Sequence, residues 1–276
     1  MSDNTIDSEL PTEIDITIAH EARVYDYWLG GKDNYPADRA LGDVIAEHVP
    51  TIKTMARANR AFLARAVRYL VAEAGVTQFL DIGTGIPTAG NTHEVAQQLD
   101  PAARIVYVDK DPIVLAHARA LMNSTPQGRT HFIHADLHNP SSILAHRAIG
   151  ETLDRAEPIA IMLVAIMMYF RDSDRPHEII TELLDAVPSG SYLVITHPTA
   201  DFDPEAMAGV VAAAEASGIA FNPRSESDTA ALFEGTTLVD PGITPVAAWR
   251  PDLTDRPTAV TNADSAWYWA GIGRKP

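Results

Sequence analysis

The residues that most constrain this chain form the run FLDIGTGIPTAGN at 79–91. A short apolar strand ends there in an acid and continues into a glycine-rich turn, which in α/β proteins is where a nucleotide-like cofactor lies. Gly83 and Gly85 have no Cβ, so the backbone can approach a ligand closely. The turn leads into a helix for which Asn91 is the predicted N-cap and Glu94 the capping-box partner. The segment therefore predicts an α/β fold with a ligand site at this turn.

A second acid strengthens this interpretation. The run IVYVDKD at 105–111 is a β-branched strand that ends in Asp109, one crossover helix after the glycine turn. An acid in that position binds the two hydroxyls of a ribose. A dinucleotide fingerprint would have a third glycine at position 88, where this chain has Thr88, so a pyrophosphate is poorly accommodated. S-adenosylmethionine has no phosphate and tolerates the difference. For the loop by itself, a glycine turn that only joins a strand to a helix is the alternative.

The composition points to small-molecule chemistry. The chain has 276 residues, of which 46% are hydrophobic, enough for one large α/β domain with a helical addition. Its formal net charge is −16 and no run of Lys or Arg exceeds two residues, so the basic footprint of a protein that binds nucleic acid or an anionic membrane is missing. We therefore expect a small-molecule substrate, no nucleic-acid partner and no membrane partner, while the oligomeric state stays open.

The compartment and the absence of metal are also predicted. The chain has no cysteine, which excludes disulfides and thiolate metal sites and suits a reducing cytoplasm. The N-terminal run MSDNTIDSEL is unlike a signal peptide, and no apolar run approaches the ~20 residues of a membrane span. The longest apolar run, at 159–170, is expected to be a strand buried on both faces. The histidines show no spacing typical of a zinc site, so no metal is expected.

The order of predicted elements divides the chain into three parts. Residues 1–15 are expected to be a disordered tail, because they are charged and show no pattern. Residues 16–75 should form an N-terminal helical layer, with helices over 19–29 and 54–73. Residues 76–276 should form the main domain, in which alternating strands and helices imply parallel strands joined by right-handed crossovers. Strands are predicted over 77–82, 104–108, 130–134, 159–166 and 191–196, and helices over 92–99, 112–122, 140–148 and 175–187.

After the fifth strand the pattern changes. A helix is predicted over 203–217, and another begins near Ser225, with Asp228 completing a capping box. Two extended segments, 243–249 and 266–272, are separated by a loop and should pair antiparallel. The sheet is therefore expected to be mixed at one edge.

Several blocks of the chain match a known family. They are ARVYDYWLGGKDNYPADRA at 22–40, RANRAFLARAVRYL at 57–70, FLDIGTGIPTAGNTHEVAQ at 79–97, VYVDKDPIVLAHARALM at 106–122, GSYLVITHPT at 190–199 and WYWAGIGRKP at 267–276. With them the chain resembles class I S-adenosylmethionine-dependent methyltransferases, and more narrowly a bacterial family once catalogued only as a domain of unknown function. The resemblance implies a Rossmann-like, seven-stranded, mostly parallel sheet with one antiparallel edge strand, an N-terminal helical layer, and bound S-adenosylmethionine with an unassigned methyl acceptor.

The resemblance also implies roles for single residues. Asp81, Gly83 and Gly85 fall on the motif that packs against the methionyl part of S-adenosylmethionine, and Asp109 falls on the ribose-binding acid. Asp81 could alternatively cap only the loop amides. Asp111 is the rival to Asp109, but the proline that follows it suits the cap of the next helix.

Two further residues fall on the adenine site of the family. Asp136 lies where an acid commonly accepts a hydrogen bond from the adenine amino group, and the amide of Leu137 is then available to a ring nitrogen. A solvated loop acid is the alternative for Asp136. The family usually carries a histidine near position 168, where this chain has Met168, so no catalytic role of that histidine can be transferred.

The block 23–35 is rich in aromatic and charged residues and has too few aliphatic residues to belong to a core. Tyr25 or Tyr27 could reach the methionyl carboxylate or the acceptor, and with Asn34 would belong to a lid over the cofactor. A surface layer is the alternative. Arg60, on the helix before the first strand, could pair with the methionyl carboxylate in a bidentate fork, or be an ordinary surface arginine.

Two residues are candidate bases. His197 ends the fifth strand, at the rim where acceptors bind in this fold, and Tyr169 lies near the end of the fourth. Methyl transfer from a sulfonium is an in-line displacement, so alignment and exclusion of water should supply most of the catalysis. An oxygen acceptor would also need a base. A structural role is the alternative for a lone histidine.

Two rival functions are considered. An NAD(P)-dependent oxidoreductase is disfavoured by Thr88 and by the absence of a Tyr-x-x-x-Lys pair in the sequence. A protein that binds S-adenosylmethionine without catalysis is the other rival, and Met168 keeps it open.

Overall fold

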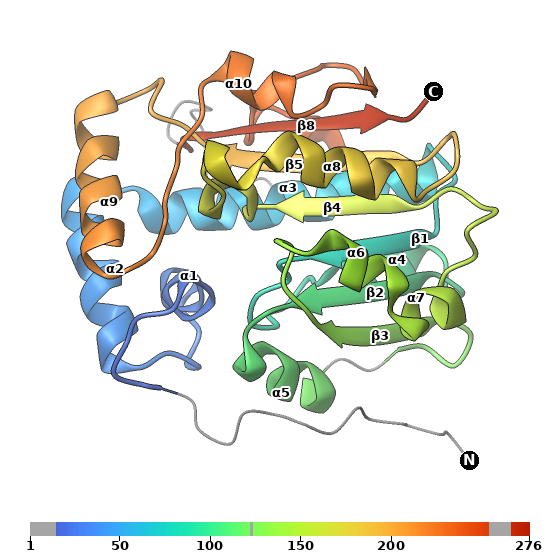
Figure 1. Ribbon diagram of the computed structural model, residues 1–276, viewed down its shortest axis with the longest axis horizontal. Coiled ribbons are helices and arrows are strands. Elements are labelled where there is room, and N and C mark those ends of the chain that lie inside the picture. Colours follow the sequence, from blue (N-terminus) through green and yellow to red (C-terminus); the bar gives the residue numbers. More distant parts are fainter. Residues whose placement is uncertain (1–14, 122–123, 254–265) are drawn as a thin grey trace.

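The computed structural model describes residues 15–121, 124–253 and 266–276 (Figure 1). The predicted tail therefore lies outside the described residues, except for Asp15. At the centre is a mixed sheet in the order β3-β2-β1-β4-β5-β8-β6, with β7 also paired to β8. Five parallel strands coincide with the five predicted ones, which confirms the α/β fold. They are β1 (Gln78–Ile82), β2 (Arg104–Asp109), β3 (Arg129–His134), β4 (Ala160–Val164) and β5 (Tyr192–Pro198).

The strand order creates a switch point between β1 and β4. From β1 the chain proceeds outward to β2 and β3, and then returns to place β4 on the other side of β1. The connections therefore leave this point in opposite directions, and in such sheets a ligand crevice lies outside the carboxyl ends of the strands. The predicted glycine loop follows β1, so it borders this crevice.

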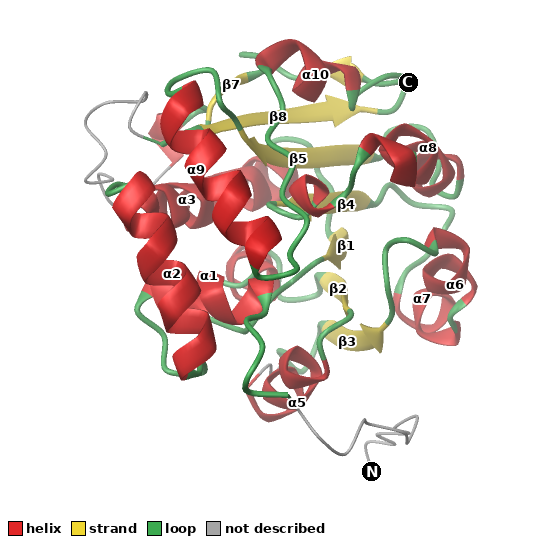
Figure 2. Ribbon diagram, turned by 60° about the vertical axis from the view of Figure 1, so that its left-hand side comes forward, coloured by secondary structure: helices red, strands yellow, loops and turns green. Residues whose placement is uncertain are grey.

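Helices cover both faces of the sheet, which explains the nearly continuous apolar strands. Phe79 packs in one core and the next residue, Leu80, in the other. Figure 2 shows α1, α2, α3 and α9 gathered on one side and α6, α7 and α8 on the other. Within the described ranges, no helix has the length and apolarity needed to cross a membrane. The helices are α1 (Glu21–Leu29), α2 (Pro36–His48), α3 (Ile52–Ala72), α4 (Thr92–Leu99), α5 (Pro112–Leu121), α6 (Pro140–Ala145), α7 (Arg147–Thr152), α8 (Pro176–Asp185), α9 (Pro204–Ala216) and α10 (Glu226–Ala231).

The antiparallel strand is not the edge of the sheet. β8 (Tyr268–Arg274) pairs antiparallel with β5, and β7 (Thr244–Pro245) pairs with β8 as the sequence predicts. β6 (Thr237–Leu238) lies beyond β8, so the sheet has eight strands rather than seven. Glycine makes the close packing against β8 possible, because a Cβ on Gly271 would lie 2.5 Å from the Ile243 side chain.

The N-terminal helical layer contains a helix that the sequence reasoning missed. α2 lies beside α9 (Figures 1 and 2), and its Leu41 and Ile45 belong to the core. The expectation that the block 23–35 lies outside a core is wrong as well, because Val24 and Trp28 of α1 belong to the same core. Gly209 of α9 permits the close approach, since a Cβ there would lie 2.3 Å from the His48 ring. The layer thus joins helices from both ends of the chain.

A buried carboxylate holds the beginning of this layer together. Asp38 is fully buried and accepts hydrogen bonds from the backbone amides of His20 (2.9 Å) and Tyr35 (2.8 Å). It also forms an ion pair of 3.3 Å with Arg23, which is 4% exposed. Buried charges are tolerated when they are paired and hydrogen-bonded. The polar composition of this segment is therefore compatible with its position inside the protein.

Candidate active site

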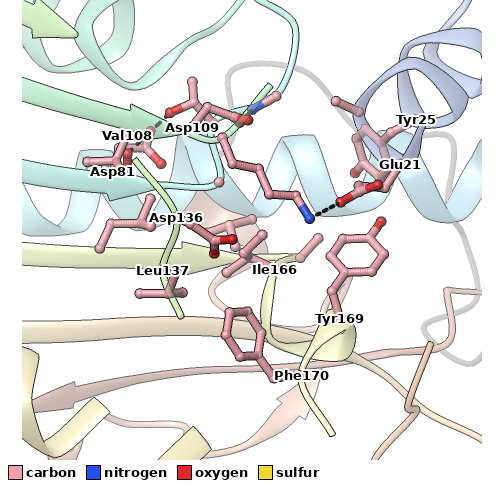
Figure 3. Close-up of a pocket in the computed structure, with 18 of the residues that line it drawn as sticks. Glu21, Tyr25, Asp81, Val108, Asp109, Asp136, Leu137, Ile166, Tyr169 and Phe170 are labelled. Atoms are coloured by element: carbon pink, nitrogen blue, oxygen red, sulfur yellow. Dashed lines mark hydrogen bonds and ion pairs between the residues drawn. The ribbon is translucent and has the colours of Figure 1, made fainter. Parts of the chain in front are cut away.

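A pocket opens at the carboxyl ends of β1, β2 and β4, bounded by α1 and α3 (Figure 3). The structure brings most of the predicted site residues to its lining: Asp81, Gly83, Gly85, Asp109, Asp136, Leu137, Arg60, Tyr25 and Tyr169. Three predicted residues, Tyr27, Asn34 and His197, lie elsewhere.

The glycine loop depends on the conformational freedom of its glycines. Gly83 and Gly85 have φ values of 75° and 66°, in the left-handed region that favours glycine. Gly83 also lies against the wall of the pocket, because a Cβ there would be 2.7 Å from the Ile166 side chain. Its amide donates to the Val108 carbonyl (2.8 Å), which fixes the loop to the end of β2.

Asp109 is anchored where β2 ends. Its two carboxylate oxygens accept from the amides of Gly85 and Asp111, at 2.8 and 2.9 Å. Burial raises the pKa of Asp109, and the hydrogen bonds from these two amides limit the rise. Each carboxylate oxygen can accept more than one hydrogen bond, so capacity is left for a diol. Asp111 instead accepts from the amide of Ile113 at the start of α5, as its predicted capping role requires.

Asp81 is a buried carboxylate that does not cap the loop amides. Its Oδ2 accepts from the Thr92 hydroxyl at 2.6 Å. Burial raises the pKa of Asp81 to about 6, and the charge of Asp109 adds to the rise. An acid kept in this unfavourable environment is typical of a functional position.

Asp136 and Leu137 follow β3 on the far side of the pocket. Asp136 Oδ1 accepts from the amide of His138 (2.9 Å) and lies 2.7 Å from its ring. Partial burial opposes ionisation, but these bonds lower the pKa of Asp136 overall. The His138 ring stacks on Phe170, with centroids 4.2 Å apart, so the loop is tied to the pocket wall.

One end of the pocket contains polar atoms that lack partners. Asn59 is 1% exposed, and its amide nitrogen donates to the Tyr25 hydroxyl at 2.9 Å. Its Oδ1, and the Nε of Arg60, are buried with no hydrogen-bond partner among the described residues. The outer nitrogen of Arg60 donates to the Gly90 carbonyl at 3.2 Å, which orients the guanidinium. Such unpaired buried atoms are costly unless a ligand satisfies them.

Asn59 was missed by the sequence reasoning, although a pattern could have found it. It lies between Met55 and Phe62 at helical spacing, on the apolar face of α3, where an amide has no partner within the helix.

Glu21 was also missed. It begins α1 and forms a 2.8 Å ion pair with Lys110, drawn as a dashed line in Figure 3. Burial opposes its ionisation, but the charges of His20 and Lys110 lower the pKa of Glu21 overall. This pair ties α1 to the end of β2 across the pocket.

Tyr169 lines the pocket from the 3₁₀ turn Met167–Tyr169 that follows β4. Burial raises the pKa of Tyr169 well above its ordinary value, and the negative charge of Glu21 adds to the rise. The phenol therefore keeps its proton at neutral pH. It can donate a hydrogen bond, and it is poorly suited to the role of base that the sequence analysis considered.

His197 is not in the pocket. The ring is fully buried, with Nε2 3.0 Å from the Arg224 guanidinium and Nδ1 3.0 Å from the Pro198 carbonyl. Burial lowers the pKa of His197 to about 4. The ring is therefore neutral and fixed by its neighbours, and the expectation of a catalytic base at this position is corrected to a structural role.

Tyr27 and Asn34 also lie away from the pocket. The Tyr27 hydroxyl donates to Asp43 of α2 at 2.7 Å. The Asn34 amide donates to buried Asp26 at 2.8 Å. Both residues therefore serve the helical layer itself. Tyr27 is two positions from Tyr25 on α1 and so lies on another face of that helix, and Asn34 follows the end of the helix.

The fold and the pocket together define a class I methyltransferase: a switch point beside a glycine loop, acids after adjacent strands, and an antiparallel final strand. The chain belongs to the S-adenosyl methyltransferase family, whose model matches residues 7–276. It is therefore an S-adenosylmethionine-dependent methyltransferase, and S-adenosylmethionine is its cofactor. The rival oxidoreductase function is excluded by this membership.

Solved structures agree with the family. A Streptomyces avermitilis protein of the DUF574 family is 42% identical, with a TM-score of 0.92 over 96% of this chain and 100% of that chain. A candidate methyltransferase from Thermobifida fusca is 40% identical, with a TM-score of 0.85 over 95% of this chain and 96% of its own. The mitomycin 7-O-methyltransferase MmcR, at 19% identity and a TM-score of 0.50 over 81% of this chain and 56% of that chain, shares the fold. No curated protein matches the chain significantly.

Proposed function

We propose that the strand-end pocket binds S-adenosylmethionine in one defined orientation and that the enzyme transfers its methyl group to a small molecule. The ribose lies on Asp109, and the adenine lies between the end of β2 and the loop of Asp136 and Leu137. The methionyl end lies at Asn59 and Arg60. S-adenosylmethionine supplies the electrophilic methyl group, and the protein supplies the alignment.

The observation that carries this orientation is the pair of unpartnered atoms at one end of the pocket. Asn59 Oδ1 is an acceptor and Arg60 Nε is a donor, and both are buried. An α-amino acid presents one ammonium and one carboxylate, so it satisfies both atoms at once. The carboxylate of Asp109 is bonded to the Gly85 amide, whereas Arg60 is bonded to the Gly90 carbonyl, so Asp109 is left to bind the diol.

The residues at the end of the pocket beside α1 suit transfer to a hydroxyl or amine. Tyr169 keeps its proton, so it donates a hydrogen bond that orients the acceptor atom. Glu21 is ionised despite its burial, because the charges of His20 and Lys110 lower its pKa, so its carboxylate can accept a hydrogen bond from the acceptor and relay the released proton to solvent. Neither role requires His197.

The orientation is tested with two ligands that differ only at the methionyl end. S-adenosylhomocysteine carries the amino acid, whereas 5′-methylthioadenosine lacks it. In Asn59→Leu and Arg60→Met, calorimetry should show at least tenfold weaker binding of S-adenosylhomocysteine, with little change for 5′-methylthioadenosine. Arg57→Met, at an exposed position of the same helix, is the matched control.

Equal losses for both ligands would mean that the substitutions disturb the pocket as a whole. The assignment of the methionyl end would then be wrong. If S-adenosylhomocysteine failed to bind the wild-type protein, the whole binding mode would be refuted.

A further inference from the structure

A second pocket lies next to the first, within the helical layer. Its walls come from α1, α2, α3 and α9, together with the turn Met167–Tyr169. Glu21 and Tyr169 line both pockets, so the two spaces meet at these residues. In Figure 3 both side chains lie at the end of the first pocket that faces α1. An occupant of the second pocket would therefore approach the first at a carboxylate and a phenol.

The lining of the second pocket is apolar except near this junction. Aliphatic side chains from three helices, such as Val24, Ile45 and Val210, form most of its wall. The polar side chains that can face an occupant are Glu21, Tyr169 and Tyr268, because the Trp28 nitrogen already donates to the Gly42 carbonyl at 3.2 Å. Among the described residues that line it, none is Lys or Arg.

This distribution of charge favours some kinds of ligand over others. A carboxylate or phosphate would meet the ionised Glu21. Lys110 already pairs with Glu21 from the side of the first pocket, and the lining of the second offers no further cation, so burying a second anion there is unfavourable. A largely apolar molecule with one hydroxyl or amine instead matches both parts of the wall. Most of its surface would contact aliphatic groups, and its polar atom would lie beside Glu21 and Tyr169.

The walls of the pocket are adaptable. Its cavity volume is about 30 Å³, so a ring-sized molecule requires side chains to move. Three of the seven methionines of the chain line it: Met55, Met168 and Met207. Methionine is unbranched and flexible, and it is favoured where a surface must fit ligands of varied shape. The pocket is therefore one that can open around a ligand without unfolding its helices.

We propose that this second pocket binds the methyl acceptor, and that the acceptor is an uncharged, largely apolar small molecule carrying one hydroxyl or amine. The inference rests on the proposed function. The acceptor oxygen or nitrogen forms its bond to the transferred methyl carbon as the carbon–sulfur bond breaks. The electron pair of that bond stays on sulfur, and the proton of the acceptor passes by way of Glu21 to solvent. The lining, which contains no Lys or Arg among its described residues, disfavours anionic acceptors.

The test uses 2-naphthol and its anionic relative 2-naphthoate, with the enzyme saturated by S-adenosylhomocysteine. Calorimetry should show binding of 2-naphthol and at least tenfold weaker binding of 2-naphthoate. Met207→Trp fills the pocket and should weaken 2-naphthol binding at least tenfold while S-adenosylhomocysteine still binds. Ala212→Trp, at an exposed position of the same helix, is the matched control and should change neither affinity.

The outcomes separate this inference from the function on which it rests. Intact binding of S-adenosylhomocysteine with no binding of 2-naphthol, or with equal binding of 2-naphthoate, overturns the assignment of the acceptor pocket. An equal loss of 2-naphthol in Met207→Trp and Ala212→Trp also overturns it. Loss of S-adenosylhomocysteine binding in the wild type instead refutes the proposed function.

Discussion

The two pockets that meet at Glu21 and Tyr169 are built in different ways. The strand-end pocket takes its polar groups from neighbouring parallel strands, where register fixes them: Asp109 is paired with His134 at the ends of β2 and β3. The second pocket takes its walls from helices that come from both ends of the chain. Its side chains are mostly aliphatic or methionine, and few hydrogen bonds fix them.

The protein thereby combines a fixed site with an adjustable one. A backbone-anchored carboxylate such as Asp109 is held by two amides and is preorganised for one ligand. A wall containing Met55, Met168 and Met207 can rearrange around another ligand. We expect substitutions in the first pocket to affect the cofactor strongly and those in the second to affect only the acceptor.

The largest expected effect is that of Asp109→Ala. It removes two charge-assisted hydrogen bonds to the ribose, worth about 1.5–3 kcal/mol each, and also frees the amides of Gly85 and Asp111. S-adenosylhomocysteine binding should weaken by about a hundredfold or more, while 2-naphthol binding should persist. Unchanged cofactor affinity in a folded variant would show that the ribose lies elsewhere. Equal losses of affinity for S-adenosylhomocysteine and 2-naphthol would show that the two pockets do not differ in this respect.

The next effect is on stability and depends on pH. Burial raises the pKa of Asp81 from 3.8 to about 6, so between about pH 4 and 6 the unfolded chain loses this proton while the folded protein keeps it. The free energy of unfolding therefore falls as pH rises through this window, by about 2–3 kcal/mol, and stays lower above it. Asp81→Asn should remove this dependence and be more stable than the wild type at pH 7.5.

Urea unfolding at pH 4 and at pH 7.5 measures this prediction for both proteins. A variant that is less stable at both values would show that the carboxylate is needed for the hydrogen bond with Thr92. The acid would then have a structural role, and the contrast between a ligand-directed pocket and a packed one would weaken.

A smaller effect is expected at the junction. Tyr169→Phe removes the hydroxyl that orients the acceptor and leaves the ring that lines both pockets. We expect kcat to fall about tenfold, consistent with the loss of one hydrogen bond in the transition state, while S-adenosylhomocysteine affinity changes little. A change in cofactor affinity with unaltered kcat would assign Tyr169 to the first pocket alone.

The smallest effect is expected for Lys110→Met. Its ion pair with Glu21 is short, but Lys110 is 42% exposed, and exposed pairs contribute about 0–1 kcal/mol. Cofactor affinity should therefore change by less than about fivefold, and the change should shrink at high salt. A large loss of cofactor affinity would indicate that this ion pair holds α1 in its closed position, and that the two pockets open together.

Much of the cofactor pocket could be predicted because it depends on local sequence. Gly83, Gly85 and Asp109 lie at the ends of apolar strands, and parallel strands place such ends along one edge of the sheet. His197 shows the limit of this reasoning. It also ends a strand, but the Arg224 guanidinium packs against its ring from a loop far along the chain.

Local sequence patterns predict the alternation of strands and helices, the glycine loop and the acids that follow β2 and β3. These features follow from hydrophobic periodicity and from the residues that favour turns, both of which act over short stretches of chain. The position of α9 in the N-terminal layer, and the meeting of two pockets at Glu21 and Tyr169, became evident only in the tertiary structure. Those features depend on packing between residues distant in sequence, which local sequence patterns do not reveal.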